Sequence, residues 1–168
     1  MSEAERSAAA LDRVHDGDPW HGPSRAAVLK GVTAAEAAFR PAPDAHSIWA
    51  IVLHMRSWTR EVTRRARGGV SALPEDGDWP PPPPPTAAAW RECLQSLDAA
   101  HAELAALVRG LSDEELSARV KPRPGESAPG ISIRGMIRSL GEHDIYHTGQ
   151  VAMLKRLARN APPGHSSG

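Results

Sequence analysis

Two histidines one helical turn apart, His143 and His147, are the residues of this sequence best suited to holding a metal ion. They occur in GEHDIYHTGQ, residues 141–150. Helical residues four positions apart share a face, with Cβ atoms about 5–6 Å from each other. Both imidazole rings can therefore reach one cation at about 2.0–2.1 Å. The pair is either two surface histidines or part of a metal site that takes a third ligand from elsewhere.

A candidate third ligand is His54, in WAIVLHMRSW. It follows Ile51 by three positions and precedes Trp58 by four, so it borders the apolar stripe of an amphipathic helix and faces a helical interior. Burying an unpaired imidazole is unfavourable, and a bound metal removes that difficulty. A core histidine with a protein partner is the alternative. The HxxxH spacing lacks the glutamate of HExxH, so zincin-type catalysis is not indicated.

The elements that must position these histidines are helices, because no segment alternates in the manner of a strand. Serine or threonine precedes several of the helical segments as a candidate N-cap, including Ser2, Ser24, Thr33 and Ser47. Helical patterns cover residues 2–14, 24–32, 33–39, 47–68, 90–111 and 131–160. We expect an all-α protein, a four-helix bundle with long crossover loops, formed by one domain over residues 1–168. The long spacers mean that the topology need not be simple up-down.

A run of six prolines, Pro80–Pro85, follows Trp79 between two of the helices. Such a run is neither helix nor central strand and adopts a stiff polyproline II conformation. We interpret residues 79–85 as a proline-rich spacer between helices. The alternative is a ligand for a proline-binding partner.

Composition narrows the classes of function. Of the 168 residues, 20 are basic and 20 acidic, so no overall charge attracts nucleic acid or an anionic membrane. Cys93 is the only cysteine, which excludes an intrachain disulfide and a thiolate cluster, and we expect it to be a packing residue. The polar N-terminus and the lack of a span of about 20 apolar residues predict a cytoplasmic protein.

SIWAIVLHMRSW and HDIYHTGQVAMLKRL together resemble the DinB/YfiT-like family of metal-binding four-helix-bundle proteins. The resemblance extends from about Trp20 to Leu157. It implies a divalent metal, most often zinc or nickel, bound by His54 from one helix and by His143 and His147 from the last. It also implies a homodimer and a role in the stress response. Members of the family are metal-dependent hydrolases or transferases that use low-molecular-weight thiols such as bacillithiol and mycothiol.

Three neutral imidazoles leave the charge of the cation uncompensated and at least one coordination position open. There a metal can activate either water or a thiol cofactor. We therefore expect a metal-dependent enzyme, of thiol transferase type, that acts on a small electrophilic substrate. The alternatives are a hydrolase and a non-catalytic module that the metal stabilises.

Several neighbours complete the predicted site. His21 is a candidate general base. Asp144 either accepts the second N–H of a histidine ligand or lies at the edge of the bundle. The residues predicted to line the pocket are Gln150, Trp20 and Trp58. We expect His101 to be a core histidine with a hydrogen-bond partner, and Tyr146 to be a packing residue.

Overall fold

The computed structural model describes residues 1–125 and 130–161, which contain seven α-helices. Their bounds are α1 Glu3–His15, α2 Arg25–Leu29, α3 Ala34–Ala38, α4 Ile48–Ala66, α5 Ala87–Gly110, α6 Asp113–Ser117 and α7 Ile133–Asn160. Isolated β-bridges, such as Val70 with Lys121, are the only pairing of strand type among these residues. The protein is an all-α helical bundle.

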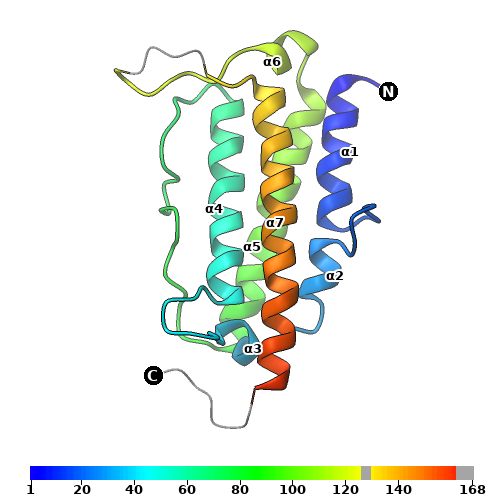
Figure 1. Ribbon diagram of the computed structural model, residues 1–168. Helices are drawn as coiled ribbons and strands as arrows, with labels where there is room; N and C mark the ends of the chain where they lie inside the picture. The colour runs from blue at the N-terminus through cyan, green and yellow to red at the C-terminus, as the bar shows by residue number, and fades with distance from the viewer. Residues whose placement is uncertain (126–129, 162–168) are drawn as a thin grey trace.

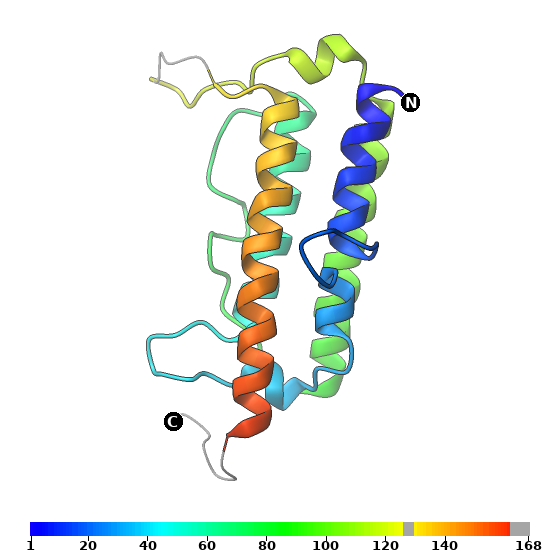
Figure 2. The ribbon, with the colours of Figure 1, turned by 45° about the vertical axis from the view of Figure 1, so that its right-hand side comes forward.

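Four long helices, α1, α4, α5 and α7, form the bundle, and α2 continues the column that α1 begins (Figure 1). α4 and α5 run in the same direction, whereas α1 and α7 run the opposite way (Figures 1 and 2). α5 packs between α1 and α4, and α7 packs against both α1 and α4. The topology is therefore not simple up-down, because two consecutive long helices are parallel.

The parallel pair requires a connection that returns along the whole bundle, and residues 67–86 provide it (Figure 1). The segment crosses the outer face of α4 and is attached to it by hydrogen bonds. Ser57 Oγ donates to the carbonyl oxygen of Gly77 at 2.8 Å, and Trp58 Nε1 donates to Asp78 Oδ1 at 2.7 Å. The connection thus places Asp78 and Trp79 beside the middle of α4.

The helix starts follow local sequence. Ser2 and Thr33 each form a capping box with the glutamate three residues later, and Ser47 accepts a hydrogen bond from the N–H of Ala50. Ser24 occupies the N-cap of α2 without a side-chain hydrogen bond to the helix. α7 begins at Ile133 because Ser132 serves as its N-cap.

The buried side chains form two apolar clusters. One, around Trp49, packs the half of the bundle near α3, and the other, around Leu104, packs the half near α6. Cys93 is buried in the first cluster, whereas Leu94 is only partly buried. Burial raises the pKa of the Cys93 thiol to about 11, consistent with a packing role. None of the described helices has the length and apolar character needed to cross a bilayer.

Candidate metal centre

Three histidines meet halfway along the bundle, where α4 and α7 are in contact. His54 comes from α4, and His143 and His147 come from successive turns of α7. His54 Nε2 lies 2.9 Å from His143 Nε2, and one ring nitrogen of each histidine lies within 4.8 Å of those of the other two. His54 and His147 are buried, whereas the side chain of His143 is 28% exposed. The structure thus brings together the three histidines that the sequence singles out.

Each ring has an acceptor on its Nδ1 side. His54 Nδ1 lies 2.6 Å from the carbonyl oxygen of Asp78, and His147 Nδ1 lies 2.6 Å from Gln150 Oε1. His143 Nδ1 lies 3.4 Å from Asp144 Oδ1. Carbonyl and carboxylate oxygens only accept, so each Nδ1 is the nitrogen that carries the proton.

The Nε2 atoms are then unprotonated, and the lone pairs of His54 and His143 face one another. Two lone pairs at 2.9 Å repel unless a positive charge lies between them. In a tetrahedral site with metal–nitrogen bonds of about 2.0–2.1 Å, two ligand nitrogens are about 3.3 Å apart, close to the spacing of His54 and His143. The donor set therefore fits a divalent cation, and imidazole nitrogens suit zinc, copper, iron or nickel.

Burial keeps the His54 and His147 rings in the neutral form that binds metal. The pKa of His147 falls to about 4, mainly through burial and with a smaller contribution from the nearby His143 and His54 rings, against the opposite effect of Gln150. Burial likewise lowers the pKa of His54. Both side chains are neutral near pH 7, as coordination requires.

The connection formed by residues 67–86 holds the His54 ring in place. The indole of Trp79 stacks on the His54 ring with centroids 3.9 Å apart, and His46 stacks on the other face of Trp79 at 3.6 Å. Asp78 accepts from both His54 and Trp58. Sequence reasoning missed Asp78 and Trp79, because no local pattern shows that a loop 24 residues further on returns to His54. It missed His46 for the same reason, since His46 contacts Trp79 of that loop.

A cavity of about 450 Å³ borders the centre on the side of His54 and His143. Its walls are mainly apolar and include Trp58. The other lining residues are Val62, Arg65, Asp78, Ile131, Met136, Ser139 and Leu140. A small molecule in this cavity would lie against the open side of the three histidines.

Behind α7, Asp144 forms a buried ion pair with Arg25 of α2, with Nη1 and Oδ2 2.5 Å apart. Asp144 thus stands between His143 and Arg25 rather than at the bundle edge. Arg25 Nη2 also lies 2.6 Å from His15 Nδ1. Sequence reasoning missed Arg25, because its partner is 119 residues away.

The other predicted residues lie in different places. Gln150 contacts His147 and donates to the Tyr146 hydroxyl at 3.1 Å. Tyr146 is 64% exposed rather than packed in the core. Trp20 and His21 lie on the exposed turn between α1 and α2, outside the lining of the cavity, and Trp20 is fully exposed. Gly22, in the same turn, has a φ of 139°, which favours glycine. A catalytic role for His21 stays a prediction.

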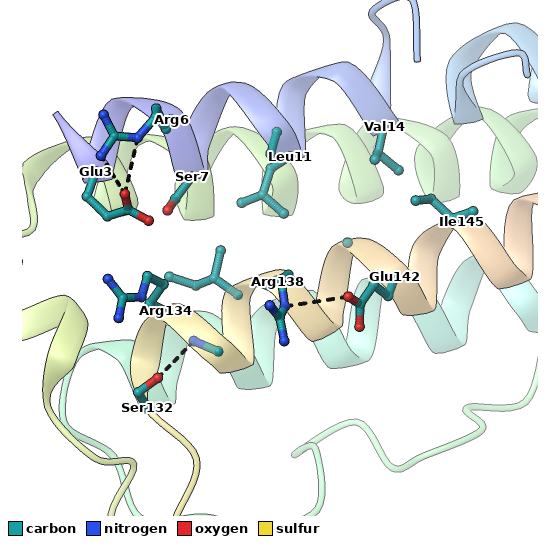
Figure 3. A pocket seen from close by; sticks show the side chains of 14 residues that line it. Glu3, Arg6, Ser7, Leu11, Val14, Ser132, Arg134, Arg138, Glu142 and Ile145 are labelled. Carbon is teal, nitrogen blue, oxygen red and sulfur yellow. Dashed lines mark hydrogen bonds and ion pairs between the residues drawn. The ribbon is translucent and has the colours of Figure 1, made fainter. Parts of the chain in front are cut away.

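A larger hollow, about 650 Å³, lies away from the histidines, between α1 and α7. Figure 3 shows Leu11 and Val14 of α1 facing Ile145 of α7 across it. Arg6 pairs with Glu3, and Arg138 with Glu142, at its edge. The size of this hollow does not make it the functional site, because none of the three histidines lines it.

Residues 25–151 match the sequence pattern of the DinB superfamily. The chain belongs to this superfamily. Its fold is similar to the crystal structure of a DinB-like protein, YjoA, from Bacillus subtilis, with a TM-score of 0.65 and 12% sequence identity over 93% of each chain. Comparison with curated protein sequences gives no significant match.

Proposed function

We propose that this protein is a metal-dependent enzyme whose three-histidine centre activates a thiol cofactor or water against a small electrophile. The observation that carries the proposal is the shared orientation of His54, His143 and His147. Their Nδ1 atoms face acceptors, while Nε2 of His54 and Nε2 of His143 meet beside a cavity. One ring nitrogen of each histidine lies within 4.8 Å of those of the other two. Three protein ligands leave a coordination position open, as in catalytic rather than structural zinc sites.

The bound cation, zinc or nickel by the resemblance, would supply Lewis acidity that lowers the pKa of a thiol or of water. The chain's own residues orient the ligands and exclude solvent. Asp78 and Gln150 hold the Nδ1 protons of their histidines. Trp79 covers one face of His54 and keeps bulk water from it. His143, the most exposed ligand, marks the side from which a guest would approach.

The cavity supports a substrate with an apolar body. Trp58, Met136 and Leu140 are among its walls. The guanidinium of Arg65 lies 5.5 Å from the centre of the Trp58 ring, but it is already paired with Glu61. A partly apolar electrophile therefore fits the walls better than a highly charged one.

Elemental analysis of protein purified without added metal tests the centre, and His54→Ala and His147→Ala should lose the ion. His21→Ala is the matched control, because it removes an exposed histidine and should retain the metal. If His21→Ala keeps the metal but loses turnover, the predicted role of His21 is confirmed.

Activity is tested with the metal-loaded chain, a panel of low-molecular-weight thiols and a panel of electrophiles. Consumption of thiol that requires the metal supports transfer, whereas ester hydrolysis without thiol supports the hydrolase alternative. If no thiol or ester reacts while the metal still raises the unfolding temperature, the enzyme proposal fails. The remaining alternative is then a non-catalytic module that the metal stabilises.

The resemblance also implies a homodimer. A surface that supports this expectation is the outer face of α7, where Tyr146, Met153 and Leu157 are exposed at 64%, 67% and 47%. Sedimentation equilibrium of the wild type and of Met153→Glu tests it. A monomeric wild type contradicts the dimer without affecting the metal centre.

A further inference from the structure

A buried ion pair lies directly behind the three-histidine centre. Arg25 and Asp144 are 1% and 5% exposed, and their side chains meet at 2.5 Å. Removing two charges from water has a desolvation penalty that their attraction does not always recover. Stability alone is therefore a weak reason for this pair, and its position beside a histidine ligand suggests another.

The two oxygens of Asp144 have different partners. Oδ2 accepts from Arg25, and Oδ1 faces Nδ1 of His143 at 3.4 Å. The other amino group of Arg25 lies 2.6 Å from His15 Nδ1. His15, Arg25, Asp144 and His143 thus form a continuous series of contacts from α1 through α2 to the metal centre on α7.

His143 is the histidine of the three that its neighbours hold least firmly. His54 and His147 are buried, and their Nδ1 acceptors lie at 2.6 Å. The His143 side chain is 28% exposed, and its Nδ1 contact is longer. Its ring depends on how the Asp144 carboxylate is held, and Arg25 is the group that holds this carboxylate.

We infer that Arg25 is a positioning residue for the metal centre. By fixing the Asp144 carboxylate, it keeps the proton of His143 on Nδ1 and directs the Nε2 lone pair toward His54 and His147. The inference rests on the proposed metal centre. It concerns a residue that has no contact with the ion or the substrate.

The first measurement reports the tautomer of His143 in the metal-free full-length chain. Long-range ¹H–¹⁵N correlation spectra of ¹⁵N-histidine protein distinguish Nδ1–H from Nε2–H rings, and His143→Gln assigns the signal. We expect Nδ1–H in the wild type, a mixture in Arg25→Gln and an intermediate result in Arg25→Lys. If Arg25→Gln does not fold, the double variant R25M/D144L removes both charges together, a change that buried ion pairs often tolerate.

The second measurement is zinc affinity by competition with a chelator. Loss of a partner behind a ligand weakens metal binding by about 10- to 100-fold, and we expect this for Arg25→Gln and the double variant. Trp90→Phe is the stability control. It removes a buried hydrogen bond to the carbonyl oxygen of Val32, a bond that involves neither Arg25 nor Asp144, and it should leave the zinc Kd unchanged.

The outcomes separate the two proposals. An unchanged His143 tautomer and an unchanged zinc Kd in the Arg25 variants would overturn the positioning role while leaving the metal centre intact. A wild-type chain that binds no zinc or nickel would overturn the proposed function, and the tautomer spectra would still decide what Arg25 does. Equal loss of zinc affinity in Trp90→Phe would show that the effect is general destabilisation and would also overturn the inference.

Discussion

The protein holds two groups of buried or partly buried histidines, and the two groups differ in which ring nitrogen faces a hydrogen-bond acceptor. In the group on α4 and α7, each Nδ1 faces an acceptor, and the Nε2 atoms of His54 and His143 meet at 2.9 Å. In the group on α1 and α5, His15 and His101 stack at 4.0 Å, and their Nε2 atoms face carboxylates. The first group leaves lone pairs that need a cation, whereas the second is satisfied by the protein.

The comparison shows that the hydrogen-bond partners of the two ring nitrogens determine whether a histidine keeps a lone pair that a metal ion can use. His15 Nδ1 accepts from Arg25, so its proton is on Nε2, toward Asp98. His101 Nε2 donates to Asp12 at 3.0 Å. Burial lowers the pKa of both rings, as it does at His54 and His147. Burial and neutrality alone therefore do not distinguish a metal ligand from a core histidine.

The largest expected difference is in metal content. His147→Ala should reduce the bound metal from about one ion per chain to near zero, since two imidazoles hold a divalent cation weakly. His101→Ala removes an equally buried histidine from the other group and should leave the stoichiometry unchanged. Elemental analysis after dialysis measures both, and retention of the metal by His147→Ala would contradict the assignment.

The next difference is in how the metal affects unfolding. At a free metal concentration of about 100 times Kd, binding to the native state adds about 2.7 kcal/mol to the free energy of unfolding. Urea titrations with and without metal should show this gain in the wild type and in His101→Ala. A gain of equal size in His147→Ala would mean that the ion binds elsewhere.

The sequence specified much of this arrangement through local signals. The capping boxes at Ser2 and Thr33 are spacing rules over three residues, and the His143–His147 pair needs only one helical turn. The apolar stripe around His54 showed which way its ring faces. These features depend on neighbours along the chain, so a single sequence is enough to predict them.

The rest depends on contacts between distant segments. Nothing in the local sequence distinguishes Arg25 from a surface arginine, because its partner Asp144 is on α7. Asp78 lies in a loop with no helical period. The position of the loop is set by the hydrogen bond from Trp58 to Asp78 and by the stacking of Trp79. The same limit applies to Trp20, since a tryptophan in a turn gives no indication of which side of the turn faces solvent.

A third difference concerns stability without metal. Asp12→Ala leaves the buried Nε2–H of His101 without its acceptor and should reduce the free energy of unfolding by about 1–3 kcal/mol. The zinc Kd should not change, because Asp12 has no contact with the metal ligands. Urea unfolding and chelator competition on one preparation test both statements. A higher zinc Kd in Asp12→Ala would show that the two groups of histidines are coupled.

The last expected difference is in pH dependence, which shows as a change of slope. The pKa of His15 falls from 6.5 to about 4, mainly through burial and then through the charge of Arg25. Between these pH values the unfolded chain binds the proton and the native chain does not, so stability decreases as pH falls through this window. The contribution is up to about 1.4 kcal/mol per pH unit.

His15→Gln keeps an acceptor for Arg25 and removes the titrating ring. Metal-free unfolding of this variant between pH 7 and about 4 should have a shallower slope than the wild type, by about one proton. Identical slopes of the free energy of unfolding against pH would show that His15 is protonated in the native state. The assignment of a neutral His15 ring that accepts from Arg25 at Nδ1 would then be wrong.

The long return of residues 67–86, together with α5 and α6, lies between His54 and His143, which are 89 positions apart. During synthesis, the N-terminal ligand leaves the ribosome well before the last helix exists, and no ion can be held until that helix docks. Closing so large a loop is among the slower steps of a helical fold. Metal uptake would therefore report completed chains, and fragments that end before α7 should remain empty however much metal is present.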